Sequence, residues 1–167
     1  MAECGGVKRQ DARTPAGARE PDRELDRLAS EVVAAAIEVH QTLGPGFLES
    51  VYEHALCVEL GLRNVSFQRQ VPVAVAYKGH RVGESCLDLL VAGRLIVELK
   101  AIEALAPIHW VQVRSYLKAT RCVLGLLIYF NVTVLLRGVR RVILTTKLLA
   151  SWRPGAYPNG IASTAVC

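Results

Sequence analysis

The sequence lacks an apolar stretch of the kind that spans a membrane. The longest nearly apolar run, residues 122–136, has 15 residues and includes Asn131 and Thr133. A transmembrane helix needs about 20 apolar residues, so this run favours buried strands. The first 24 residues also lack the apolar segment of a secretory signal. We therefore expect neither membrane insertion nor secretion.

The sequence lacks closely spaced cysteines, which excludes the usual cysteine-based architectures. The five cysteines form no Cys-x-x-Cys pair, and two of them stand close to the ends of the chain. We therefore expect neither a disulfide framework nor a zinc site. Cys57, Cys86 and Cys122 stand among apolar residues in the sequence, where a free thiol behaves as a small hydrophobic side chain. These features predict a reducing, cytoplasmic location.

Acidic residues are nearly absent after residue 100. Residues 101–167 contain 8 Lys and Arg but 1 Asp or Glu, whereas residues 1–100 contain 12 and 14. A half of the chain that is so basic suits a polyanion such as nucleic acid. Surface charges that only keep the protein soluble explain the bias equally well. The candidate contacts to backbone phosphates are Lys118, Arg121, Arg137, Arg140 and Arg141.

The chain has the length and composition of one folded domain. It has 167 residues, of which 51% are hydrophobic, and domains usually contain about 100–200 residues. Hydrophobic periodicity is missing from residues 1–24 and 151–167, which predicts a disordered N-terminal tail and an irregular C-terminal tail. Residues 25–150 would then form the domain.

Hydrophobic periodicity predicts both helices and strands within this domain. Apolar residues that recur every three or four positions indicate a helix, and apolar residues that alternate with polar ones indicate a strand. The expected helices are 25–43, 47–60 and 107–120, and the expected strands are 67–77, 81–91, 94–100, 123–130 and a final hairpin of 132–136 with 140–146. This order predicts an α/β fold in which helices flank a central mixed sheet.

Charged residues interrupt two of the apolar strands. Glu98 and Lys100 stand two positions apart in one strand, so their side chains share a face. A turn at residues 92–93 would bring Asp88 to the same edge. Two carboxylates beside a lysine can hold Mg²⁺ and stabilise a phosphoryl transition state. An ion pair at a sheet edge is the alternative, and the three residues taken alone favour it.

A short motif stands before the second predicted helix, where residues 46–52 are Gly-Phe-Leu-Glu-Ser-Val-Tyr. It matches the Gly-x-x-Glu-x-x-Tyr signature, and the chain resembles the GxxExxY protein family, a branch of the PD-(D/E)xK nuclease superfamily. Asp88 and Glu98-x-Lys100 match the superfamily's catalytic residues, although Leu87 replaces the proline in its name. Further matches lie in residues 69–72, 97–101, 109–120, 125–128 and 138–142. The resemblance covers about residues 26–145.

The resemblance implies a restriction-endonuclease-like core and Mg²⁺-dependent hydrolysis of phosphodiester bonds in DNA or RNA, with Mn²⁺ as an alternative ion. It implies that Asp88, Glu98 and the backbone carbonyl of Leu99 are metal ligands. It further implies that Glu49 completes the metal shell and that Lys100 is the catalytic lysine. A solvated helix carboxylate is the alternative for Glu49, because two other glutamates share its helix.

Two polar residues of the third predicted helix complete the candidate site. Gln112 and Tyr116 stand at positions i and i+4, so they share a helix face. They resemble a pair in RecB-type nucleases that orients the lysine and contacts the phosphate. The alternative is an ordinary half-exposed glutamine and a core tyrosine. His109, one turn earlier, could face the same cleft or cap the helix.

The sequence leaves a second class of function open. The same fold could serve as a nucleic-acid-binding module that does not cleave, or as a module that binds a protein partner. A homodimer is a further alternative for so small a domain.

Overall fold

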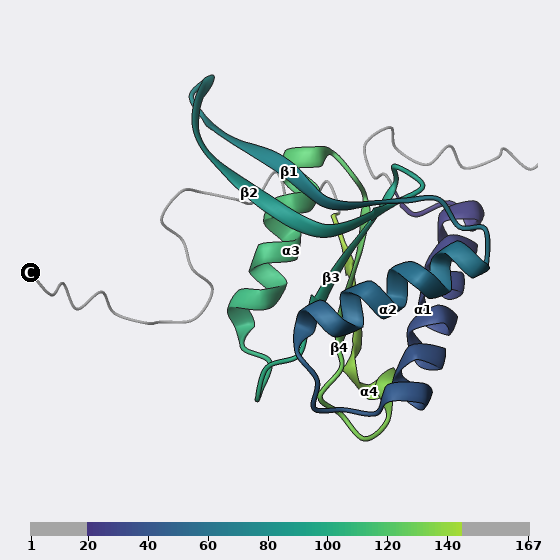
Figure 1. Ribbon diagram of the computed structural model, residues 1–167. Coiled ribbons are helices and arrows are strands. Elements are labelled where there is room, and N and C mark those ends of the chain that lie inside the picture. Colours follow the sequence, from purple (N-terminus) through teal and green to yellow (C-terminus); the bar gives the residue numbers. More distant parts are fainter. Residues whose placement is uncertain (1–19, 145–167) are drawn as a thin grey trace, which may run out of the picture.

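The computed structural model describes residues 20–144 (Figure 1). Most of the two expected tails lies outside these residues, as do residues 145–150 at the end of the predicted domain. Helix α1 (Arg23–Leu43) begins two residues before its predicted start, because the side chain of Asp22 accepts a hydrogen bond from the backbone N–H of Leu25.

A five-stranded mixed sheet forms the centre of the fold, as predicted. Its strands lie side by side in chain order, and only β3 and β4 run parallel to each other. The strands are β1 (Phe67–Tyr77), β2 (His80–Val91), β3 (Leu95–Lys100), β4 (Leu124–Tyr129) and β5 (Val139–Ile143). Every residue of β3 is buried, which is expected of a strand that is covered on both faces.

Helices cover both faces of this sheet (Figure 1). Helices α1 and α2 (Glu49–Leu62) pack on one face, and α3 (Pro107–Thr120) packs on the other. Tyr52 of α2 is fully buried, and its hydroxyl donates a hydrogen bond to the carbonyl of Gly44 at 2.7 Å. This contact fixes the start of α2 against the end of α1.

The predicted final hairpin is wrong in its first strand. The short helix α4 (Leu135–Gly138) replaces it, and β5 pairs directly with β4. The alternation of Val132, Val134 and Leu136 suggested a strand, but Leu135 is the buried residue, while Val134 and Leu136 are exposed. Burial of that one side chain favours a tight turn over a strand. The predicted end of β5, residues 145–146, lies outside the described residues.

The β1–β2 hairpin exchanges its two faces part of the way along its length. Phe67 of β1 and Leu89 of β2 pack in the core beneath α1 and α2. Val71 of β1 and Leu87 of β2, which pair with each other further out along the hairpin, pack instead in the core beneath α3. Beyond this inversion, residues 74–84 form a hairpin arm in which every residue is exposed (Figure 1).

Candidate active site

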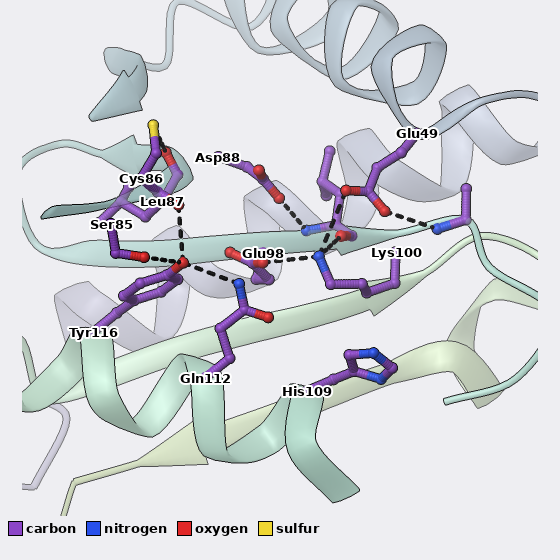
Figure 2. A network of polar contacts seen from close by, with 12 residues as sticks. Glu49, Ser85, Cys86, Leu87, Asp88, Glu98, Lys100, His109, Gln112 and Tyr116 are labelled. Carbon is purple, nitrogen blue, oxygen red and sulfur yellow. Dashed lines mark hydrogen bonds and ion pairs between the residues drawn. The ribbon is translucent and has the colours of Figure 1, made fainter. Parts of the chain in front are cut away.

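Three charged side chains meet where β3 ends (Figure 2). Glu98 and Lys100 share one face of β3, and the Lys100 ammonium donates to Glu98 Oε1 at 2.8 Å. Asp88 of the neighbouring strand accepts a hydrogen bond from the backbone N–H of Leu99 at 2.8 Å. The turn at residues 92–93 thus brings Asp88 to the same edge as the Glu-x-Lys pair.

Helix α2 supplies a fourth charged side chain. Glu49 is the first residue of α2, and its carboxylate accepts a hydrogen bond from the backbone N–H of Ala101 at 3.2 Å. Its other oxygen lies 3.5 Å from the Lys100 ammonium. Gly44 and Gly46 have φ angles of +71° and +107°, a region that glycine enters without strain, so they let the chain turn from α1 toward the site.

The Lys100 ammonium lies at the centre of this cluster. Besides Glu98 and Glu49, it donates to the backbone carbonyl of Leu99 at 2.8 Å. Three of the four groups that the sequence predicts as metal ligands therefore contact Lys100. Among residues 20–144, no three His, Cys, Asp or Glu side chains are arranged so that they could hold a metal ion as they lie. The Lys100 ammonium lies between the carboxylates of Glu98 and Glu49.

Burial dominates the electrostatics of the cluster. It raises the pKa of Glu98 to about 7, with a further contribution from the negative charge of Asp88. Burial also raises the pKa of Asp88, against the hydrogen bond from Leu99 that lowers it. Burial by itself would lower the pKa of Lys100, but the surrounding carboxylates outweigh it and the pKa is raised. The site therefore favours a cation among its carboxylates.

One oxygen of the cluster has no hydrogen-bond partner. Glu98 is only 2% exposed, and its Oε2 atom is buried and unpaired. A buried polar atom without a partner costs free energy, so such atoms in native proteins call for an explanation. Carboxylate and carbonyl oxygens are the ligands that Mg²⁺ prefers. The unpaired oxygen and the oxygens of Asp88, Glu49 and Leu99 are thus donors of the type that a divalent cation prefers, although the three carboxylates are not arranged around one metal position as they lie.

Helix α3 faces this cluster with Gln112 and Tyr116 (Figure 2). The Tyr116 hydroxyl donates to the backbone carbonyl of Cys86 at 2.9 Å and accepts from the Gln112 amide at 2.9 Å. It also lies 3.0 Å from Ser85 Oγ, which must donate because the hydroxyl has only one proton to give. Tyr116 is thus a buried tyrosine that ties α3 to β2, and Gln112 lies beside it, half-buried.

His109 caps helix α3. Its Nδ1 atom accepts a hydrogen bond from the backbone N–H of Ala106 at 3.0 Å. Of the two alternatives for His109 in the sequence, the structure shows the helix cap.

The five basic residues are spread over three parts of the molecule rather than gathered beside the carboxylates. Lys118 and Arg121 lie at the C-terminal end of α3, next to the start of β4 and so at the end of the sheet opposite Lys100. Arg137 belongs to α4, and Arg140 and Arg141 belong to β5. Arg141 contacts Asp26 of α1 at 2.5 Å.

Two polar residues of this region escaped the sequence analysis. Ser85 stands in an exposed part of β2 with no pattern around it that marks a contact to α3. Glu53 of α2 is only 6% exposed. It precedes the buried Leu56 and Leu60 by three and seven positions, so helical spacing places it on the apolar face and could have indicated its burial.

The fold and the cluster together define a class of protein. A mixed α/β sheet that unites an aspartate and a Glu-x-Lys pair on adjacent strands is nuclease-like. Residues 26–142 match the profile of the PD-(D/E)XK nuclease superfamily, which covers well over half of the chain, and the chain belongs to this superfamily. Its members are generally nucleases that act on nucleic acids and typically use divalent metal ions.

No curated protein and no solved structure gives a significant match to the chain. Within residues 20–144, no helix is both long enough and apolar enough to cross a membrane.

Proposed function

We propose that the protein is a Mg²⁺-dependent nuclease of the GxxExxY branch that hydrolyses phosphodiester bonds of DNA or RNA. The single observation that carries this proposal is the cluster of buried Glu98 and Lys100 with half-buried Asp88, and with Glu49 beside it. A buried charged cluster costs free energy that an apolar core would not, so its presence at the end of the central strand favours a functional site. The unpaired Oε2 atom of Glu98 supports the same conclusion.

The metal ligands in this proposal are the carboxylates of Asp88, Glu98 and Glu49 and the backbone carbonyl of Leu99. Mn²⁺ suits the same oxygen donors and is the alternative ion. Bound Mg²⁺ would supply Lewis acidity for the scissile phosphate and for the attacking water.

Lys100 has two tasks in this proposal. Without a metal it neutralises Glu98 and Glu49, as its contacts of 2.8 and 3.5 Å indicate. When the carboxylates ligate a cation, its ammonium is free to donate hydrogen bonds to the phosphate, where negative charge develops in the transition state. Its raised pKa keeps it protonated, so it acts as a hydrogen-bond donor rather than as a base.

Helix α3 supplies the substrate contacts on the other side. We assign to Gln112 a hydrogen bond to the phosphate, because its half-buried amide lies on the face of α3 that looks toward the cluster (Figure 2). Tyr116 holds α3 against β2 through its contact with Cys86. The further phosphate contacts in this proposal are the basic residues Lys118, Arg121, Arg137, Arg140 and Arg141, which add affinity without sequence selectivity.

A cleavage assay with matched variants tests the proposal. Linear and circular DNA and RNA, single- and double-stranded, are incubated with the wild type in Mg²⁺, Mn²⁺ or EDTA. We expect cleavage that requires the metal ion and is lost in Glu98→Ala and Lys100→Ala. Glu38→Ala, on the exposed side of α1, serves as the control and should cleave like the wild type. A folded wild type that neither cleaves nor binds Mn²⁺ would contradict the proposal and leave a structural ion cluster.

A further inference from the structure

Gln70 has an unusual backbone conformation in the middle of a strand. Its φ angle is +49°, in the left-handed region that non-glycine residues rarely adopt. The other non-glycine residues with positive φ in the described part of the chain lie in turns or next to helix ends. Gln70 is therefore held in this conformation by its surroundings, since its own preference is against it.

A buried glutamate of α2 supplies the restraint. Glu53 accepts hydrogen bonds with both carboxylate oxygens, from Arg69 Nε at 2.5 Å and from Gln70 Nε2 at 2.9 Å. The other end of the Gln70 amide accepts from the thiol of Cys86 at 3.3 Å. Cys86 is exposed, which corrects the expectation that it lies among apolar side chains. The Gln70 side chain is thus fixed between α2 and β2.

The restrained residue stands opposite Asp88. The ladder between β1 and β2 pairs Arg69 with Leu89 and Val71 with Leu87, but it skips Gln70 and Asp88. The ladder between β2 and β3 also stops one residue short of Asp88, at Leu89. The hairpin exchanges its faces at this point. Asp88 therefore has no paired residue in β1 or in β3. Its carboxylate accepts a hydrogen bond from the backbone N–H of Leu99.

We propose that Glu53 is a positioning residue for the candidate metal site. Its hydrogen bond to Gln70 keeps Gln70 and Asp88 from pairing in the β1–β2 ladder. This interruption lets the Asp88 carboxylate reach the end of β3. The inference rests on the proposed function, because it assigns Glu53 to a metal site that the proposed function requires. Glu53 itself contacts Arg69 and Gln70 and acts on the metal only through Asp88.

Mn²⁺ binding by the full chain, measured by isothermal titration calorimetry, tests this inference. Residues that orient metal ligands typically change metal affinity by about 10–100-fold, so Glu53→Ala should bind Mn²⁺ at least about tenfold more weakly. Adding Gln70→Gly to Glu53→Ala should restore most of the affinity, because glycine enters the left-handed region without a restraint. Glu59→Ala is the matched control, since Glu59 is a glutamate of α2 that pairs with Arg63.

A second variant covers the case in which Glu53→Ala does not fold. Gln70→Val keeps Glu53 but introduces a β-branched residue that disfavours positive φ, and it should weaken Mn²⁺ binding to a similar extent. Wild-type affinity in Glu53→Ala or in Gln70→Val would overturn the inference. Failure of Gln70→Gly to rescue a folded Glu53→Ala protein would overturn it too, because general damage to the packing of α2 is not repaired by a glycine in β1.

Amide hydrogen exchange in EDTA separates this inference from the proposed function. The Leu99 N–H reports on the position of Asp88 without any metal, because the Asp88 carboxylate is its acceptor. Glu53→Ala should exchange this amide faster than the wild type, while Val97, which pairs with Leu89, stays unchanged. If the wild type binds no Mn²⁺, the proposed function fails, and this exchange rate still decides the role of Glu53. An unchanged Leu99 rate would overturn that role.

Discussion

Lys100 and Glu98 form a buried ion pair that uses only one of the two glutamate oxygens. The ammonium lies 2.8 Å from Oε1, and Oε2 has no partner. Since Glu49 and the Leu99 carbonyl also contact the ammonium, Lys100 is an internal counter-ion for groups that we propose as metal ligands. Binding of a metal ion at this site would exchange one cation for another.

Removal of Lys100 should make the fold depend on a divalent cation. Lys100→Ala leaves a buried carboxylate without its partner, and breaking a buried ion pair costs roughly 3–5 kcal/mol. In EDTA we therefore expect a clear loss of unfolding free energy. Mg²⁺ should raise the melting temperature of Lys100→Ala more than that of the wild type, because the ammonium no longer competes for the carboxylates.

Thermal unfolding with and without Mg²⁺ measures both effects. Lys78→Ala, at the exposed tip of the hairpin arm, is the control and should behave like the wild type. An equal response of Lys100→Ala and wild type to Mg²⁺ would show that Lys100 and the cation do not share a site.

The raised pKa of Glu98 predicts how the stability of the metal-free protein depends on pH. The pKa of the Glu98 carboxyl is about 7 in the folded protein, whereas its ordinary pKa is 4.5. The folded carboxyl therefore keeps its proton to a higher pH than the unfolded one. The folded state thus binds more protons in this range, so the free energy of unfolding falls as pH rises from about 4.5 to about 7. The raised pKa of Lys100 contributes stability that is lost only above its ordinary value of 10.5, outside this range.

Chemical denaturation in EDTA at several pH values between 5 and 8 checks this prediction. Glu98→Gln cannot ionise and should show a flatter curve than the wild type. Parallel curves for the two proteins would contradict the assignment of the pH dependence to Glu98.

Tyr116 should matter for stability as well as for activity. Tyr116→Phe removes a hydroxyl that bonds to Gln112, Ser85 and the Cys86 carbonyl. A buried polar group that loses its partner costs about 1–3 kcal/mol, and we expect a loss of unfolding free energy in this range. The measurement is urea denaturation. Tyr129→Phe, whose hydroxyl bond to Glu103 is exposed, is the control and should change stability much less. Equal losses in the two variants would argue against a special role of the Tyr116 hydroxyl.

Salt dependence should distinguish among the basic residues. Each lysine or arginine that neutralises a backbone phosphate contributes about one to the slope of log affinity against log salt. Arg121→Ala and Arg137→Ala should each reduce this slope by about one. Arg141→Ala should reduce it less, because Asp26 already pairs with Arg141. Fluorescence anisotropy of labelled DNA or RNA in EDTA measures the slope. A slope unaffected by every variant would place nucleic acid elsewhere on the protein.

Local patterns predicted most of the fold and part of the site. The bounds of β1 and α3 agree with the expected ranges, because apolar spacing and the Pro107 start are local signals. The turn at residues 92–93 likewise predicted that Asp88 and Glu98 lie together. The contact between Glu49 and Lys100 spans 51 residues, and only the family resemblance indicated it.

Two features of the fold depend on tertiary contacts, and local sequence patterns did not predict them. The strand expected at 132–136 is absent because Leu135 enters the core, while its neighbours Val134 and Leu136 are exposed. The left-handed Gln70 had no local sign, since glycine and asparagine are the usual markers of positive φ. Its side-chain amide donates a hydrogen bond to Glu53, which is 17 residues away in the chain.

The hairpin arm, residues 74–84, can change in length without disturbing the rest of the sheet. Residues 74–84 are all exposed, and the two strands of the arm pair only with each other, because β2 meets β3 only at residues 89–91. Lengthening or shortening the arm would leave the registers of the sheet and the position of the carboxylates untouched. A peptide tag, a fluorophore or an evolutionary insertion should therefore disturb the candidate site least when it is placed at the tip, at Lys78 and Gly79.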